Sequence, residues 1–178
     1  MYTLEVFKAE AKQAEEWLTK EYAQIHTGRA APALLDGVQT ESYGAYQPLK
    51  NVASVSIEDP KTLRVVPWDK SQIKDIERAL HGANLGFSVA SDDQGVRVII
   101  PALTTETRNQ LAKIAKDKLE DARITIRKAR EAMLNELKDL KLPEDTFRNA
   151  KDDLQKLVDA ANDTLEAQLK RKEGEIQS

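Results

Sequence analysis

The stretch HTGRAAP, residues 26–32, interrupts a long helical pattern with a glycine and a proline. Before it, apolar residues recur at steps of three and four, the spacing of one helix face, which predicts a first helix from about Thr3 to Thr27. Glycine adopts the left-handed conformation without a Cβ clash, so Gly28 is predicted to end this helix as its C′ residue. Pro32 has no amide donor and pushes Ala31 toward extended geometry. The chain is therefore expected to leave its first helix here without resuming it.

The middle third of the chain has the pattern of a small α/β (β-α-β) unit. Its helix is predicted from Lys70 to Leu80 and is stopped by Gly82, while Asp59-Pro60 and the residues 91–95 are turn signals. The segments with a strand pattern are Val38–Tyr43, the alternating residues around Val55 and Ile57, Leu63–Val66, and Val96–Ile100.

Beyond Pro101 the helical period returns and lasts for most of the remaining chain. A second helix is predicted from Thr105 to Leu140, with Thr104 as its N-cap and a length of roughly 50 Å at ~1.5 Å per residue. Pro143 suits the first turn of a third helix, whose apolar residues again follow one face.

Each of these three long helices has a single apolar face, which must be covered for the helix to be stable. Packing the three together covers every face, so we expect an α+β fold: a discontinuous three-helix bundle of residues 1–29 plus 104–178, with an α/β domain of residues 30–103 inserted. The two crossings between the domains are hinge candidates. The predicted hinge residues are Thr27, Gly28, Ala30, Pro32, Pro101, Leu103 and Thr104.

Composition excludes several classes of protein. The 178 residues include no cysteine and only two histidines, and the net charge is −3. Disulfides and cysteine-based zinc sites are thereby removed, and a bulk-charge coat for nucleic acid is disfavoured, so that any RNA contact must be local. No signal peptide, membrane span, phosphate-binding loop or metal pattern is recognisable. We therefore expect a cytoplasmic protein without catalytic residues, metal or cofactor, and we separately predict that it is a monomer.

A basic ribbon borders the apolar stripe of the second helix. At 100° per residue, four cations fall within about 60° of the helix circumference. One interpretation is a solvated face with local ion pairs, Glu120 with Arg123 and Arg127 with Glu131, and geometry alone slightly favours it. The other is an edge that contacts phosphates, for which guanidinium forks are well suited. The ribbon consists of Lys116, Arg123, Arg127 and Arg130.

Arg29 has two interpretations of equal weight. It either interacts with carbonyls at the end of the first helix, or it extends an RNA-contacting surface.

Taken together, these residues resemble the ribosome recycling factor family over essentially the whole chain and in the same order. In the first two thirds the matching residues are Thr27-Gly28-Arg29-Ala30 with Pro32, Leu34-Leu35-Asp36, Tyr43-Gly44, Ala53-Ser54-Val55 with Glu58-Asp59, Pro67-Trp68-Asp69-Lys70-Ser71, Leu85-Gly86, and Pro101, Leu103, Thr104 and Glu106. In the last third they are Ala122-Arg123, Arg127, Arg130, Gln155-Lys156-Leu157, Asp159-Ala160 and Lys172-Glu173.

The resemblance implies an L-shaped, two-domain translation factor that is not itself an enzyme. Such a factor binds the ribosome after termination and, with the GTPase elongation factor G, separates the subunits. The resemblance further implies that the bundle lies on large-subunit ribosomal RNA near the peptidyl transferase centre. The matching cations, predicted to bind rRNA, are Arg29, Arg123, Arg127 and Arg130.

The chain departs from the family pattern at three positions. His26, Thr107 and Glu131 stand where the family usually has cations, and each change weakens the basic edge.

Two rival functions remain as alternatives. One is a helical scaffold or chaperone-like adaptor, which needs a large exposed apolar patch. The other is a hydrolase that uses carboxylates such as Asp59 and Asp69.

Overall fold

The computed structural model describes residues 2–178 and contains two compact units. Unit 1 comprises the residues up to Tyr22 together with Asn109–Ser178, and unit 2 comprises Ala23–Arg108. Unit 1 is helical, and unit 2 combines short helices with antiparallel sheets. The α+β class predicted from the sequence is confirmed.

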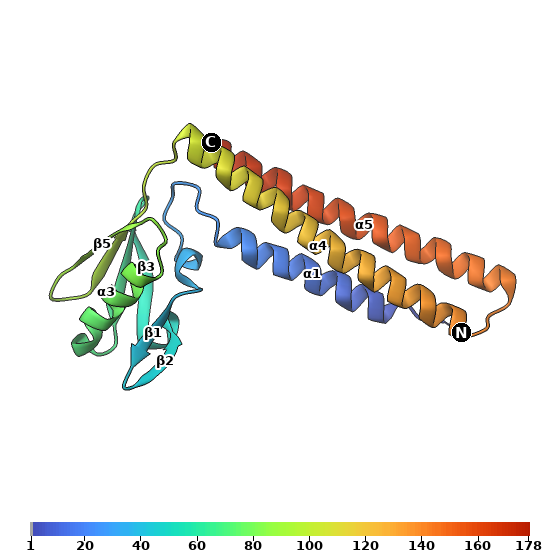
Figure 1. The fold of residues 1–178 in the computed structure, drawn as a ribbon, viewed down its shortest axis with the longest axis horizontal. Helices are drawn as coiled ribbons and strands as arrows, with labels where there is room; N and C mark the ends of the chain where they lie inside the picture. Colours follow the sequence, from blue (N-terminus) through green and yellow to red (C-terminus); the bar gives the residue numbers. More distant parts are fainter. Residues whose placement is uncertain (1) are drawn as a thin grey trace. The chain divides into compact units, whose positions relative to one another are not determined.

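Unit 1 is a bundle of three helices, α1 (Glu5–Ala23), α4 (Thr105–Asp139) and α5 (Glu144–Gln177), of which α1 and α5 run in one direction and α4 in the other (Figure 1). The predicted span of the second helix is therefore right to within one residue, and the third helix begins directly after Pro143 as expected. The largest fully buried side chains of the bundle are Phe7, Leu18, Ile126, Leu137, Leu154, Leu165 and Ile176.

The expected end of the first helix is wrong. The helix α1 ends at Ala23 rather than near Thr27, although the apolar pattern continues to the buried Ile25. The next residue, His26, packs its ring edge-on against Phe87 with the ring centroids 5.4 Å apart, so contacts within unit 2 prevail over the helical period here. Gly28 does have positive φ, +79°, but it follows the helix by several residues and is not its C′ residue.

A four-stranded antiparallel sheet forms the centre of unit 2. Its strand order is β3-β4-β6-β5, so β4 and β5 are parallel to one another with β6 between them. Because α3 (Ile73–Gly82) connects β4 to β5, the predicted β-α-β unit is present in a split form. The strands are β3 (Ala53–Asp59), β4 (Thr62–Pro67), β5 (Ser88–Ser91) and β6 (Val96–Ile99).

The core of unit 2 lies between α3 and one face of this sheet. Leu63 and Val65 of β4 are fully buried, and so are Val96 and Val98 of β6 and Ile76 of α3. Alternation along β4 and β6 places the buried leucine and valine side chains of these two strands on one face of the sheet.

A hairpin and several short helical turns precede the sheet. The strands β1 (Gln39–Ser42) and β2 (Ala45–Pro48) are joined by Tyr43 and Gly44, which both have positive φ, as a two-residue type I′ turn requires. Sequence analysis found the first strand but missed β2, whose four residues show no buried alternation. The short helices are η1 (Pro32–Leu35), α2 (Leu49–Val52) and η2 (Lys70–Gln72).

Both chain crossings are fastened to one turn of unit 2. The amide of Ala30 donates to the carbonyl of Pro60 at 2.8 Å, and the amide of Ile100 donates to the carbonyl of the adjacent Lys61 at 2.7 Å. The crossings also approach each other, because a Cβ built on Gly28 would lie 3.6 Å from Cγ of Leu103. The turn between β3 and β4 thus holds the entering and leaving segments side by side.

Candidate nucleic-acid interface

Three of the four predicted arginines line one hollow between α4 and α5. Arg123, Arg127 and Arg130 occur on successive turns of α4, and the hollow has a volume of about 360 Å³. Val158 and Asn162 of α5 complete its wall, and Ile126 contributes the apolar floor. The helical spacing read from the sequence therefore places these three guanidinium groups on one surface. We call this surface, formed by Arg123, Arg127 and Arg130 with α5, the α4–α5 groove.

Arg123 is held by a carboxylate of α5. Its Nη2 lies 2.5 Å from Oε2 of Glu166, and both side chains are partly exposed, at 37% and 40%. The local pair with Glu120 that the sequence suggested is wrong, because packing of α5 offers Arg123 a closer partner than its own helix does.

Arg127 and Lys116 also pair with glutamates, and both cations are more exposed than Arg123. Arg127 lies 3.4 Å from Oε1 of Glu120, two turns earlier on α4, and not beside Glu131 as predicted. Lys116 lies 3.6 Å from Oε1 of Glu173 on α5. Exposed pairs of this kind contribute only about 0–1 kcal/mol, so a phosphate can replace either carboxylate at little cost.

Arg130 is positioned by a neutral relay. Its Nε donates to Oε1 of Gln155 at 3.1 Å, and the amide nitrogen of Gln155 donates to Oδ1 of Asp159 at 2.8 Å. This hydrogen bond orients the guanidinium group through one edge only. Among residues 2–178, no carboxylate forms an ion pair with Arg130. The Nη atoms of Arg130 keep their capacity to donate to an anion.

Sequence analysis missed the α5 side of the groove as a functional unit. Gln155, Asp159, Asn162 and Glu166 recur at steps of three and four, which places them on one face of α5. That spacing was visible in the sequence, but the match between this face and the arginines of α4 required the packed bundle.

Arg29 belongs to unit 2 and is exposed. Because α1 ends at Ala23, Arg29 lies six residues beyond the helix and not in its last turn, where a contact with the terminal carbonyls was predicted. The guanidinium group is therefore presented to solvent from the first crossing.

The other crossing residues include one helix cap. Oγ1 of Thr104 accepts from the amide of Thr107 at 3.1 Å and lies 2.9 Å from the hydroxyl of Thr107, which confirms the predicted N-cap. Thr107, one of the departures from the family pattern, thus takes part in starting α4. Glu131, another departure, is exposed on α4.

The carboxylates of the hydrolase hypothesis are used to fix turns. Oδ1 of Asp59 accepts from the amide of Lys61 at 2.8 Å, and Oδ1 of Asp69 accepts from the amide of Ser71 at 2.9 Å. These backbone donors help to lower the pKa of both groups, with the hydroxyl of Tyr43 the larger cause at Asp69. A lowered pKa opposes the protonated form that a general acid needs.

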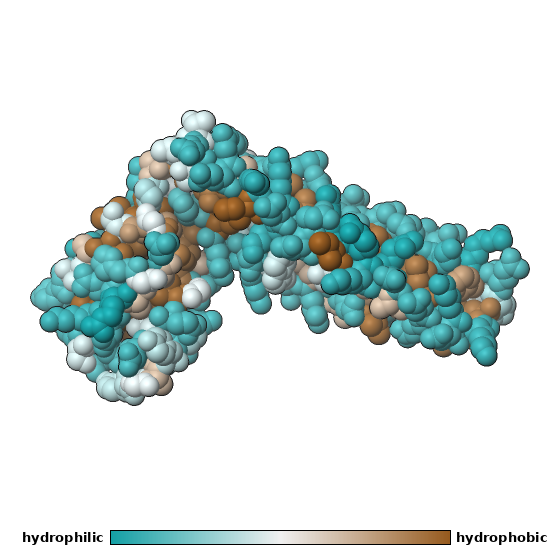
Figure 2. Space-filling model, viewed as in Figure 1, coloured by the Kyte–Doolittle hydropathy of each residue, from teal (hydrophilic) through white to brown (hydrophobic). Residues whose placement is uncertain are grey.

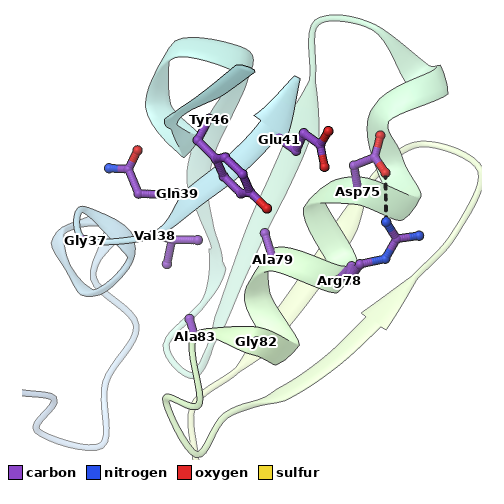
Figure 3. A pocket seen from close by; sticks show the side chains of 10 residues that line it. All are labelled: Gly37, Val38, Gln39, Glu41, Tyr46, Asp75, Arg78, Ala79, Gly82 and Ala83. Atoms are coloured by element: carbon purple, nitrogen blue, oxygen red, sulfur yellow. Dashed lines mark ion pairs between the residues drawn. The ribbon is translucent and has the colours of Figure 1, made fainter. Parts of the chain in front are cut away.

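A further hollow of about 350 Å³ lies in unit 2 between the β1–β2 hairpin and α3 (Figure 3). Tyr46 and Glu41 stand at its rim, and the ion pair of Asp75 with Arg78, 3.6 Å, lies beside it. None of the predicted site residues lines this hollow. Among residues 2–178 there is also no group of three or more potential metal ligands, and no helix long and apolar enough to span a bilayer.

Comparison with known proteins decides which family this architecture represents. The family model described as ribosome recycling factor matches residues 18–176, which is nearly the whole chain and includes all four predicted arginines. The chain belongs to the ribosome recycling factor family. Its function is accordingly ribosome recycling during protein biosynthesis, and the scaffold alternative is not favoured.

Curated relatives resemble the chain over nearly its full length. The ribosome-recycling factor of Psychrobacter arcticus is 37% identical over 175 residues, covering 96% of this chain and 95% of the relative. That of Streptococcus pyogenes serotype M28 is 39% identical over 179 residues, covering 98% and 97%.

Solved structures of recycling factors share the fold. A solution structure of a ribosome recycling factor aligns with a TM-score of 0.76 and 28% identity, covering 99% of both chains. The Thermus thermophilus factor, described with Escherichia coli elongation factor G on the E. coli post-termination complex, aligns with a TM-score of 0.63 and 34% identity, covering 97% of this chain and 95% of that one.

Proposed function

We propose that this recycling factor binds the post-termination ribosome and, with elongation factor G, separates the ribosomal subunits. Membership of the family supports this role, as does the relative described with elongation factor G on the post-termination complex. The factor acts by binding and leverage as a cytoplasmic monomer without a cofactor, and GTP hydrolysis belongs to its partner.

The α4–α5 groove is the proposed contact with large-subunit rRNA. The observation that carries this proposal is the convergence of Arg123, Arg127 and Arg130 on one hollow, where their protein partners are exposed and replaceable. Guanidinium groups on successive helical turns can each fork onto a phosphate, whereas lysine would act only as a point charge. Arg29 provides a fourth contact from unit 2.

Ribosome co-sedimentation and subunit splitting by Arg130→Ala and Gln155→Ala test this contact. Three phosphate contacts give a slope of log K against log salt of about −2 to −3, and loss of one reduces its magnitude by about 0.7–0.9. Arg130→Ala should weaken binding and reduce the slope. Gln155→Ala keeps every charge, so it should weaken binding about threefold, the loss of roughly one hydrogen bond, with the slope unchanged. Undiminished splitting by Arg130→Ala would count against the site.

The two crossings are the proposed hinge between the domains of residues 1–29 plus 104–178 and 30–103. Ala30 and Ile100 are hydrogen-bonded to the β3–β4 turn, and Pro32 begins the helix η1. We therefore expect bending to concentrate just outside these fastened points, at Thr27–Arg29 and Pro101–Thr104.

Gly28→Val tests this hinge. A β-branched residue resists the φ of +79° that Gly28 adopts, and its Cβ would contact Leu103. The variant should split ribosomal subunits several-fold less well, and its small-angle scattering profile should change. Its affinity for RNA through the α4–α5 groove should remain. Gly174→Ala in α5, where a Cβ meets nothing within 4 Å, is the matched control. Wild-type activity together with a wild-type scattering profile would remove the hinge proposal.

A further inference from the structure

A second groove runs along the other side of α4, against α1. Its volume is about 530 Å³, and its walls come from both helices. The lining residues, which define the α1–α4 groove, are Glu10, Gln13, Ala14 and Trp17 of α1 with Asp121 and Thr125 of α4.

The character of this groove is acidic and aromatic. Glu10 and Asp121 are exposed, and none of the ion pairs within residues 2–178 engages either carboxylate. Trp17 is 37% exposed, so part of its indole is open to a partner. The groove therefore offers two exposed carboxylates that form no ion pair within the described residues, and an aromatic surface, on the same side of the bundle.

The structure itself places a cation against Trp17. Nζ of Lys118 lies 5.6 Å from the centre of the Trp17 ring, within the range of a cation–π contact. The same Nζ lies 2.9 Å from Oε2 of Glu21, which already balances its charge. Lys118 thus shows how a cationic side chain is accommodated at this end of the groove. It also interacts electrostatically with Asp121, whereas neither Glu10 nor Asp121 forms an ion pair within residues 2–178.

From these features we propose that the α1–α4 groove binds a basic, extended segment of a partner protein. Its arginine or lysine side chains would lie between Glu10 and Asp121, with an intervening aliphatic group against Ala14 and Trp17. Glu10 and Trp17 are seven residues apart, or about 10 Å along the helix, which accommodates roughly three extended residues.

Charge decides between protein and nucleic acid as the occupant. Phosphates would face two carboxylates here, whereas the α4–α5 groove presents arginines to them. On the face drawn in Figure 2 the bundle is mainly hydrophilic, with hydrophobic residues in separate spots. An occupant held by a broad apolar face would not match such a surface. The proposed contact is thus additional to the rRNA contact and independent of it.

Trp17 supplies the readout for the test. The chain has only two tryptophans, Trp17 and Trp68, so a Trp68→Phe background isolates the fluorescence of the groove. The probe is an acetylated, amidated decapeptide of alternating arginine and alanine, titrated into the full-length protein. Comparison probes are the same peptide with glutamate in place of arginine, and oligouridylate.

The arginine peptide should change Trp17 fluorescence saturably and shift the amide resonances of the groove residues. Glu10→Gln with Asp121→Asn should weaken its binding about tenfold, as expected for loss of two exposed charge pairs. The control, Glu131→Gln with Asp139→Asn, changes net charge equally at other exposed positions of α4 and should retain wild-type affinity within twofold.

Gln13→Lys is a second variant that keeps both carboxylates. It places a fixed cation in the groove and should also weaken peptide binding, with an unchanged melting temperature to show that the bundle is intact. Equal weakening in the control pair, absence of any shift in the groove amides, or binding of oligouridylate at Trp17 as tight as that of the arginine peptide would each overturn the proposal.

Discussion

The two sides of α4 differ in charge and in the way they are held. Toward α5, the α4–α5 groove presents Arg123, Arg127 and Arg130, and its contacts are exposed and polar. Toward α1, the α1–α4 groove presents Glu10 and Asp121, and beside it a buried hydrogen bond joins the helices. One helix therefore separates a surface suited to phosphates from one suited to cations, although the chain as a whole is only slightly acidic.

Reversing charge on the arginine side should have the largest effect. Arg127→Glu with Arg130→Glu removes two phosphate contacts and adds repulsion, so binding to large ribosomal subunits should fall by about a hundredfold. Co-sedimentation at several salt concentrations measures the loss. The control is Lys128→Glu with Lys138→Glu, which makes the same change in net charge at exposed positions of α4. If both pairs weaken binding equally, overall charge rather than the groove determines affinity.

On the α1 side, Tyr22→Phe should reduce stability without affecting RNA affinity. The buried hydroxyl of Tyr22 donates to the carbonyl of Ala115 at 2.7 Å, and its loss should lower the free energy of unfolding by about 1 kcal/mol at pH 7. Urea unfolding followed by circular dichroism measures this change. Weaker ribosome binding by a folded Tyr22→Phe protein would contradict the separation of the two sides.

The same variant has a defined pH dependence. Burial is the main cause that raises the pKa of Tyr22 to about 12, whereas an unfolded tyrosine titrates near 10. The protonated phenol is the form that the fold stabilises, so its contribution is complete below about pH 10 and is lost as the pH rises through 10 toward 12. The stability difference between wild type and Tyr22→Phe should therefore narrow above about pH 10. A constant difference up to pH 11 would show that the hydroxyl is accessible to solvent.

Glu166→Gln should have the smallest effect and the opposite sign. It removes the carboxylate that holds Arg123 and that would repel a phosphate. RNA affinity should therefore increase about threefold, which corresponds to the interaction free energy of an exposed ion pair. Binding of an rRNA fragment at fixed salt measures the gain. Glu131→Gln removes a charge elsewhere on α4 and should change affinity less. Weaker binding by Glu166→Gln would mean that the Glu166 pair orients Arg123 productively rather than competing with the phosphate.

Much of the fold could be predicted because its signals are local. The apolar residues at steps of three and four mark the course of α4 and α5, Thr104 caps the start of α4, and Pro143 directly precedes α5. Each of these signals acts within a few residues. The end of α1 was misjudged because Ile25 continues the period although the backbone has already left the helix. The strand β2 was missed because its side chains, largely exposed or half-buried, carry no alternation to read.

The candidate site was predictable only in part, for a related reason. Each residue of a helix is rotated by 100° about the axis relative to the one before it. This rotation fixes the positions of Arg123, Arg127 and Arg130 around α4, so the sequence was sufficient to place them on one edge. Their contacts with Glu166 and Gln155 depend on the register between α4 and α5, and no local pattern encodes that register.

The sequence by itself determined three amphipathic helices, a positive-φ glycine at the first crossing and a basic ribbon on the second long helix. Those features follow from the conformations allowed to single residues and from the geometry of one helix. Only the tertiary structure decided which carboxylates hold the arginines, which turn fastens both crossings, and that an acidic, aromatic groove lies on the opposite side of α4. Such contacts join residues far apart in the chain, and side-chain packing between elements selects them.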